Sequence, residues 1–257
     1  MTETSALIGH TGFVGGNLLR QRPFTDRFNS SNIESIAGRE YDLLVCSGAR
    51  AEKWKANQDP EGDLRGIDRL RDALAGVSAR HVVLISTVDV YPEPVEVDED
   101  TPIDTARCHP YGLHRLELER FVAERFPTTI VRLPGVFGTG LKKNIIFDFL
   151  HGNDVDKVDS RGVFQFYGLD HLWSDVARTV ELGIPLLNVA TEPVSVGDVA
   201  RVAFGIDFDN PVLPKPARYD FRSRHAAEFG GADGYLYDAA TTLREIAAFV
   251  RAERGAA

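Results

Sequence analysis

Apolar runs and amphipathic stretches alternate along the chain, and this alternation predicts its secondary structure. Strands are expected immediately before Gly9 and at 26–30, 41–47, 81–87, 129–133 and 186–190. Helices are expected at 16–21, 67–74, 109–126, 171–182, 194–204 and 239–251. Strand and helix follow each other throughout the first half, which is typical of a parallel sheet with helices on both faces.

The apolar runs indicate that the sheet is buried. Residues 43–46 and 82–85 are each four consecutive apolar residues, as expected for strands covered on both faces. The sequence therefore predicts an α/β fold with a doubly wound parallel sheet. The sheet domain is expected at 1–140, completed by 170–192, with a smaller region formed by 141–169 and 193–257.

A glycine-rich turn separates the first strand from the first helix. Gly9, Gly12 and Gly15 stand three apart, so the backbone can turn tightly there and approach a ligand closely. The helix that follows presents free N–H groups and the positive end of its dipole, which suit a pyrophosphate. The predicted contacts are Gly9, Thr11, Gly12, Phe13, Val14 and Gly15. A glycine turn without a ligand is the alternative.

The end of the second strand bears on the choice of cofactor. NAD-binding folds usually place Asp or Glu there to bind the adenosine ribose. This chain instead has Asn29, Ser30 and Ser31, followed by Asn32, and their small side chains leave room for a 2′-phosphate. This favours NADP over NAD by a small margin, and an ordinary Asn/Ser turn is the alternative.

Small and hydroxyl-bearing residues follow two central strands. Ser47, Gly48 and Ala49 end one strand, and Ser86 and Thr87 end the next. Ligands of open parallel sheets bind at the carboxyl ends of the strands, so these residues are candidate cofactor and substrate contacts. For Ser86 and Thr87, a cap on the following turn is the alternative. The polar segment after Ala49 carries Arg50, Lys53 and Lys55. We interpret that segment as a solvated loop, with phosphate contact as the alternative.

Tyr111 and Arg115 are four residues apart in a predicted helix and share one helical face. A cation one turn from a phenol is expected to lower the pKa of the phenol. A lower pKa makes the phenol a better proton donor and acceptor at neutral pH.

The composition narrows the classes of function. The 257 residues carry a net charge of −9 without a Lys/Arg run, so no nucleic-acid or membrane partner is expected. Cys46 and Cys108 lack metal-ligand spacing, and no metal site is expected. No signal peptide or membrane-spanning run is found, and the cytoplasm is the expected location.

Three motifs occur in a family's order and spacing: the glycine turn, the segment 86–91, and Tyr111-x-x-x-Arg115. Together they resemble the extended short-chain dehydrogenase/reductase superfamily. Within it, they are similar to the NAD-dependent epimerase/dehydratase family, which acts on nucleotide sugars. The resemblance implies a Rossmann-type sheet, NADP or NAD as cofactor, and a C-terminal region that binds the substrate. It also implies a nucleotide-sugar-like small molecule as partner and allows a homodimer.

The resemblance also assigns roles to residues. It makes Thr87 the catalytic hydroxyl, Tyr111 the proton-transfer residue and Arg115 the residue beside them. Further cofactor contacts are expected at Ser47, Gly48, Ala49, Ser86, Pro134 and Val136, and substrate contacts at Thr87, Val88, Asp89, Lys142, Lys143 and Asn144. The implied reaction is an epimerisation or reduction by hydride transfer. A cofactor-binding sensor or partner protein with weakened catalysis, or a reductase of a non-sugar carbonyl, is the alternative.

Three residues depart from the family's pattern, and one of them is Ile8, which precedes the glycine turn where Thr is usual. Arg115 stands where the family has Lys, and a forked guanidinium does not replace an ammonium without consequences. Val88 stands where dehydratase members carry the first of two acids, which argues against 4,6-dehydration.

Overall fold

A computed structural model describes residues 4–256, and they form two compact units. Unit 1 contains the residues up to Pro92, then Pro102–Arg132 and Asp170–Leu187. Unit 2 contains Glu93–Thr101, Leu133–Leu169 and the residues from Asn188 onward. No helix among the residues described is long and apolar enough to cross a membrane.

Unit 1 is built on a six-stranded sheet with the strand order β2-β1-β3-β4-β5-β9. The pairs β1–β2, β1–β3 and β3–β4 are parallel, with Ile8 opposite Phe28 and Cys46 opposite Leu84. The strands are β1 (Ser5–Ile8), β2 (Asp26–Phe28), β3 (Glu40–Cys46), β4 (Ser78–Thr87), β5 (Thr128–Leu133) and β9 (Leu186–Asn188). The predicted α/β fold with a doubly wound parallel sheet is confirmed.

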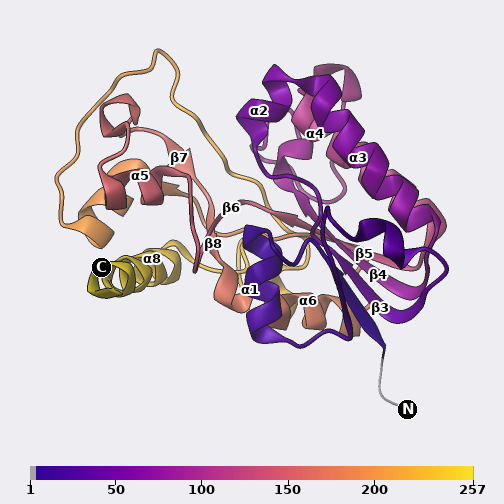
Figure 1. Ribbon diagram of the computed structural model, residues 1–257. Helices are drawn as coiled ribbons and strands as arrows, with labels where there is room; N and C mark the ends of the chain where they lie inside the picture. Colours follow the sequence, from indigo (N-terminus) through magenta and orange to yellow (C-terminus); the bar gives the residue numbers. More distant parts are fainter. Residues whose placement is uncertain (1–3, 257) are drawn as a thin grey trace. The chain divides into compact units, whose positions relative to one another are not determined.

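Helices cover both faces of this sheet: α3 and α4 lie on one side of the strands, and α1 and α6 lie on the other (Figure 1). The helices are α1 (Phe13–Gln21), α2 (Lys53–Gln58), α3 (Pro60–Ala75), α4 (Pro110–Arg125) and α6 (Leu172–Glu181). Short 3-10 turns are η1 (Ile33–Ile36), η2 (Val88–Val90), η3 (Thr105–Arg107) and η5 (Leu169–His171).

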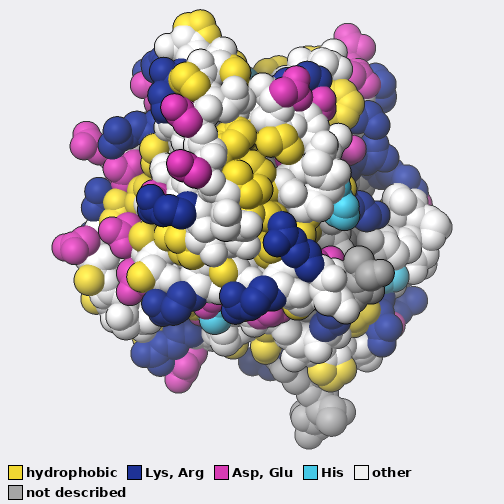
Figure 2. Space-filling view, turned by 90° about the vertical axis from the view of Figure 1, so that its left-hand side faces the viewer, with side chains coloured by type: hydrophobic (Ala, Val, Ile, Leu, Met, Phe, Trp, Pro, Cys, Tyr) yellow, Lys and Arg dark blue, Asp and Glu magenta, His cyan; other side chains and the backbone are white. Residues whose placement is uncertain are grey.

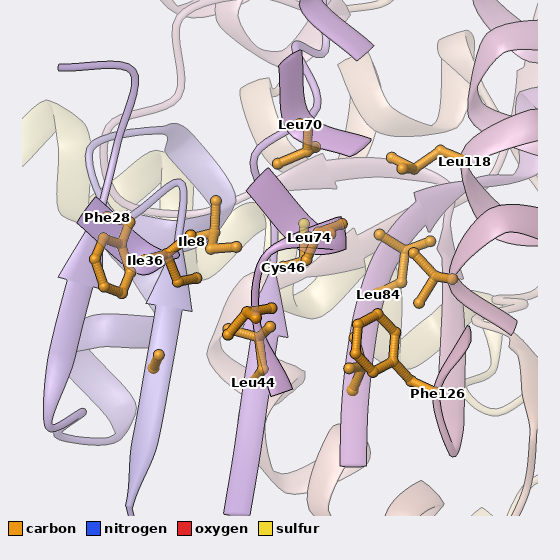
Figure 3. Close-up of a cluster of buried hydrophobic side chains, with 14 of the residues drawn as sticks. Ile8, Phe28, Ile36, Leu44, Cys46, Leu70, Leu74, Leu84, Leu118 and Phe126 are labelled. Carbon is orange, nitrogen blue, oxygen red and sulfur yellow. The ribbon is translucent and has the colours of Figure 1, made fainter. Parts of the chain in front are cut away.

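One buried cluster holds α3 and α4 against the sheet. Figure 3 shows Ile8, Leu44 and Leu84 of neighbouring strands facing the helical side chains Leu74 and Leu118. The helical members recur three to four residues apart, as do Ile67, Leu70 and Leu74 on α3, so one face of each helix is apolar. This packing fixes the start of α4 relative to the end of β4.

The segment interpreted as a solvated loop contains a helix. Residues Lys53–Gln58 form α2, and Asp59 then caps α3 by accepting a hydrogen bond from the backbone N–H of Gly62. Only Ala56 of α2 is buried, so this short helix has no apolar periodicity that sequence patterning could detect. The helix predicted at 67–74 likewise begins earlier, at Pro60.

Unit 2 contains two small sheets and further helices. Strand β6 (Gly135–Phe137) pairs in parallel with β8 (Phe166–Gly168), and β7 (Val163–Phe164) pairs antiparallel with β10 (Val194–Ser195). The helical segments are η4 (Val155–Lys157), η7 (Ala226–Phe229), α5 (Ile145–His151), α7 (Val196–Val199), the π-helical turn η6 (Ala200–Phe204) and α8 (Ala239–Ala256). Ser195 caps α7 by accepting from the N–H of Asp198.

The units differ from the predicted boundaries in one informative way. Residues 133–140 belong to unit 2, because β6 pairs with β8 rather than extending the large sheet. Unit 2 also exposes large apolar side chains at Val202, Ile206, Val212 and Leu213. Figure 2 views the side of Figure 1 on which α5, α8 and β7 lie, where hydrophobic side chains gather among Lys and Arg.

Replacing Gly15 with alanine is expected to destabilise unit 1. The new Cβ would lie 2.2 Å from the Gly9 carbonyl oxygen, so strand β1 or helix α1 must shift. We expect a loss of about 1–3 kcal/mol in the free energy of unfolding, measured with urea. Gly16→Ala is the matched control: its Cβ would come no closer than 3.8 Å to the His10 carbonyl oxygen. Equal losses in the two variants would contradict this account.

Candidate functional site

The glycine turn lies between the ends of β1 and β3. Gly9 adopts a φ of +88°, and a Cβ there would lie 2.5 Å from the Ser47 carbonyl oxygen. Gly15 is equally constrained by the Gly9 carbonyl. A Cβ on Gly12, by contrast, would lie 3.2 Å from its nearest neighbour. Two of the three glycines are thus required by the protein's own packing, and Gly12 is the least constrained of them.

The N-terminus of α1 has the properties of an anion cradle. Gly12 is its N-cap residue and supplies no side-chain hydrogen bond, and the first turn, which includes Phe13 and Val14, contains no acid. Thr11 is exposed beside it. The backbone N–H groups at this end of α1 therefore have no side-chain cap, and the residues present fit the phosphates of a dinucleotide.

The segment after β2 is a hydrogen-bonded turn. The Asn29 Oδ1 accepts from the Ser31 N–H at 2.8 Å, and the Asn32 Oδ1 accepts from the Asn29 N–H at 2.7 Å. Arg69 of α3 donates to the Ser30 carbonyl oxygen at 2.8 Å and also pairs with Glu34. A cation thus lies beside the turn at which a 2′-phosphate was predicted. The sequence motifs did not reveal Arg69, because it lies far along the chain from this turn.

Thr87 and Tyr111 meet at the carboxyl end of β4. The Thr87 side chain lowers the pKa of the Tyr111 phenol, so the two side chains are neighbours, and the Thr87 hydroxyl accepts from the Asp89 N–H at 3.1 Å. Tyr111 lies in the first turn of α4 and is buried, with 7% of its surface exposed. The predicted pair of hydroxyls is therefore brought together within unit 1.

Close packing at the start of α4 places Tyr111 there. A Cβ on Gly112 would lie 2.1 Å from the Asp89 carbonyl oxygen, so α4 lies directly against η2 at this point. The His109 ring caps α4 by accepting from the Gly112 N–H at 3.1 Å. The Tyr111 N–H donates to the Asn57 Oδ1 of α2 at 3.1 Å. Gly112, His109 and Asn57 are positioning residues that the motif did not reveal.

Arg115 is a buried structural cation. Its guanidinium donates to both oxygens of Asp63, at 2.5 and 2.8 Å, and to the carbonyl oxygens of Arg50 and Tyr111. These bonds use four of its five N–H groups, and within the part of the chain that is described its Nε has no partner. His114 approaches the same carboxylate, with Nδ1 at 2.8 Å.

The expected effect of Arg115 on Tyr111 is outweighed by burial. The guanidinium lies 3.9 Å from the centre of the phenol ring, and its charge does lower the pKa of Tyr111. Burial raises that pKa more strongly, and the negative charge of Asp89 adds to the increase. The net pKa of Tyr111 is therefore raised, and the prediction of a lowered value is wrong.

Ser86 belongs to a buried network. Its hydroxyl donates to the Glu119 carboxylate at 2.5 Å, and Arg132 of β5 donates to both oxygens of that carboxylate. Arg132 also donates to the Tyr91 hydroxyl at 2.7 Å. The hydroxyl hydrogen of Ser86 is thus used within the protein, and Ser86 holds the end of β4 to α4.

The remaining predicted residues fall in two places. In unit 1, the Ser47 hydroxyl donates to the Ile8 carbonyl oxygen, and Gly48 and Ala49 follow Ser47 after the end of β3. Val88 is buried in η2, and the Asp89 carboxylate pairs with Lys53. In unit 2, Pro134 precedes β6, Val136 lies on β6, Lys142 and Lys143 are exposed, and Asn144 caps α5. The Asn144 amide also donates to the Val136 carbonyl oxygen at 3.0 Å. The cofactor and substrate roles of these residues stay predictions.

Two other features lie apart from this site. A hollow beside α2 and α3 is lined by Arg50, Lys55, Asp59, Asp63 and Arg65, and neither Thr87 nor Tyr111 lines it. Between residues 4 and 256, no group of three or more His, Cys, Asp or Glu is arranged to hold a metal ion.

Replacing Asp63 with alanine is expected to lower the free energy of unfolding by about 3–5 kcal/mol, because it leaves a buried guanidinium unpaired. Asp68→Ala is the matched control, since Asp68 lies on the same helix and its side chain is 50% exposed. Urea unfolding at neutral pH measures both. A loss from Asp63→Ala no larger than that from Asp68→Ala would contradict the assignment.

The same pair of variants tests the ionisation of Asp63. Burial opposes its charge, but hydrogen bonds from Arg115 and His114 hold the pKa of Asp63 below its ordinary value of 3.8. The stabilisation is therefore complete above about pH 4 and is lost as the pH falls through the lower value of the folded protein. The gap between wild type and Asp63→Ala should narrow below about pH 4.

Known folds resemble this chain along nearly its whole length. A dTDP-4-dehydrorhamnose reductase from Clostridium acetobutylicum is 16% identical, with a TM-score of 0.72 over 98% of this chain and 99% of that one. RMD from Pseudomonas aeruginosa, solved with NADPH, is 18% identical, with a TM-score of 0.72 over 98% and 100%. MoeE5, solved with UDP-glucose and NAD, is 20% identical, with a TM-score of 0.69 over 98% and 99%. At these identities the likeness establishes the fold.

Sequence comparison establishes the family. No curated protein matches the chain. The model of a family described as "NAD dependent epimerase/dehydratase family" matches residues 24–153, which is just over half of the chain. The match contains Thr87, Tyr111 and Arg115 and begins after the glycine turn. With the parallel sheet and the pairing of Thr87 with Tyr111, it shows that this chain belongs to the NAD-dependent epimerase/dehydratase family.

Proposed function

We propose that the protein is an NAD(P)-dependent epimerase or reductase that acts on a nucleotide-activated sugar. The observation that carries the proposal is the proximity of Thr87 and Tyr111 at the carboxyl end of β4, where the start of α4 packs directly against η2. The glycine cradle lies at the carboxyl end of β1, in the same sheet. Ligands of parallel sheets bind at that edge, so a dinucleotide on the cradle would be directed toward the two hydroxyls.

Each residue of the pair has a distinct role in this proposal. A bound nicotinamide would supply the group that accepts or donates the hydride. Tyr111 moves the proton to or from the substrate oxygen, and Thr87 donates a hydrogen bond to that oxygen. Charge develops on this oxygen as a carbonyl forms or collapses, and a positioned donor stabilises it. Burial keeps water away from Tyr111, which limits competing proton exchange.

The turn after β2 supports NADP as the preferred cofactor. No acid from β2 occupies the position that would bind an unmodified ribose, and Asn29, Ser30 and Ser31 are small and polar. Arg69 adds a positive charge at the same turn. A guanidinium offers several donors to a phosphate, which an extra 2′-phosphate would use.

The substrate class is supported by the family and by the solved relatives. One relative was solved with UDP-glucose, and another is a reductase of a nucleotide-linked sugar. We propose that Val88 and Asp89 contact the sugar and that Lys142, Lys143 and Asn144 contact its diphosphate. Because Val88 replaces the acid required for 4,6-dehydration, epimerisation or reduction is favoured over dehydration. A non-sugar carbonyl is the alternative substrate.

One observation favours a second candidate, a cofactor-binding protein with weakened catalysis. Arg115 replaces the family's Lys, and its charge is paired with Asp63 inside unit 1. A guanidinium held in this way cannot move to a ribose or to the phenol as a flexible ammonium can. Retention of Thr87 and Tyr111 together supports the enzyme as the first candidate.

Tyr111→Phe separates the two candidates. The variant is expected to bind NADPH with an affinity within about threefold of wild type, since it loses one hydroxyl, while turnover falls by at least about a thousandfold. Calorimetry measures binding, and absorbance of the reduced nicotinamide measures turnover with a panel of nucleotide sugars. A wild-type protein that binds NADPH and turns over no member of the panel would support the binding protein.

The cofactor preference is tested by comparing NADPH with NADH. We expect tighter binding of NADPH, and we expect Arg69→Ala to reduce that preference by about tenfold, equivalent to about 1.4 kcal/mol. Arg65→Ala is the matched control, since Arg65 lies one turn earlier on α3 and is 71% exposed. A clear preference of wild type for NADH would refute the interpretation of Asn29, Ser30 and Ser31.

A further inference from the structure

A second cation, Lys53, is paired with Asp89 of η2, the turn against which the start of α4 packs. Lys53 is the first residue of α2, and its Nζ lies 2.8 Å from the Asp89 Oδ1. Its charge also acts on the Tyr111 phenol, whose pKa it lowers. The Lys53 side chain is 38% exposed, so its ammonium can reach solvent and change partners.

Arg115 cannot serve as a cation that changes partners. Its side chain is 3% exposed, and its charge is balanced by Asp63 through two short hydrogen bonds. Moving it would remove the guanidinium from the buried Asp63 carboxylate and leave only His114 beside that charge. Arg115 therefore contributes a fixed charge beneath the phenol ring, and a mobile charge must come from another residue.

We propose, on the basis of the function proposed above, that Lys53 has taken over from position 115 as the cation that assists Tyr111 in proton transfer, with Asp89 as its resting partner. Lys53 is thus a positioning residue that acts through Tyr111. The motif of a phenol and a lysine on one helix is replaced by a phenol on α4 and a lysine on α2.

The packing of α2 explains why Lys53 is in place. Lys53 and Asn57 are four residues apart, so they share one face of α2. Asn57 accepts the hydrogen bond from the Tyr111 N–H, which shows that this face is turned toward the start of α4. The bond that anchors the Tyr111 backbone to α2 therefore also places Lys53 on the face of α2 that is turned toward α4.

The charges around Tyr111 give Lys53 a defined effect. Arg115, Lys53 and the Thr87 side chain each lower the pKa of Tyr111, while burial and Asp89 raise it. His109, whose ring centre lies 6.2 Å from that of Tyr111, is kept neutral at pH 7 because burial and the Lys53 charge lower its pKa. His114 faces Asp63. Asp89 thus opposes the effect of Lys53 while the two are paired.

The proton balance of the step is simple. In reduction, hydride adds to the carbonyl carbon, and the Tyr111 O–H bond breaks as its proton passes to the carbonyl oxygen. The phenolate that remains is stabilised by the Lys53 ammonium, which keeps its own proton throughout. Oxidation runs the same transfers backward. Removal of the Lys53 charge should therefore make the phenolate harder to form.

The experiment measures the ionisation of Tyr111 in the cofactor-free protein. Replacing every tyrosine with a difluorotyrosine lowers the pKa of the phenols, so that they ionise closer to neutral pH. The signal of Tyr111 is assigned as the fluorine NMR signal that is missing in Tyr111→Phe. We expect Lys53→Met to raise the titration midpoint by about half to one pH unit, as one charge near a partly buried group does. We expect Lys53→Arg to retain most of the wild-type midpoint and Asp89→Asn to lower it.

Lys55→Met is the matched control, because Lys55 lies on the same helix and no shift is expected from its removal. If Lys53→Met and Lys55→Met titrate alike, the proposal is overturned. Where turnover is found, the pH profile of kcat should shift in the direction of the titration. A protein that shows the Lys53 shift but binds no NADPH or NADH would refute the proposed function and leave the electrostatic coupling of Lys53 to Tyr111 established.

Discussion

The buried ion pair between Glu119 and Arg132 is the interaction on which the rest of the site depends. It joins α4 to β5, and through Ser86 and Tyr91 it also fixes the residues on either side of Thr87. Both charged side chains are at most 6% exposed, so the pair must be complete to be tolerated. With α4 held to β4 and β5 in this way, the backbone contact between Gly112 and Asp89 brings Tyr111 to Thr87.

A second buried pair, Asp63 with Arg115, works differently. It joins α3 to α4 and holds a charge under the Tyr111 ring, but its hydrogen bonds leave that charge no freedom to move. In our proposal, Arg115 holds α4 to α3 while Lys53 assists the Tyr111 phenol, two roles that a single lysine could perform.

The sheet was predictable because its central strands are continuous apolar runs. The glycine turn was predictable because a side chain at Gly9 or Gly15 would clash with the backbone. Thr87 and Tyr111 were predicted as a pair through the family resemblance, and the structure brings the two side chains together at the carboxyl end of β4. Asp63, Asn57, Arg69 and the α2 position of Lys53 were not, because their roles arise from contacts between residues far apart in sequence. The net pKa of Tyr111 was mispredicted for a related reason: helical spacing reveals a neighbouring charge but not the burial that outweighs it.

The Asp63–Arg115 pair also constrains how this sequence can change. Replacing Arg115 with Lys alone would remove the bidentate fork and leave part of a buried carboxylate without a donor. Replacing Asp63 alone would leave the guanidinium uncompensated. The two positions are thus epistatic, and return to the usual motif requires a double substitution through an unstable intermediate. Relatives of this chain should therefore keep or lose the acid and the arginine together, and their alignment columns should covary.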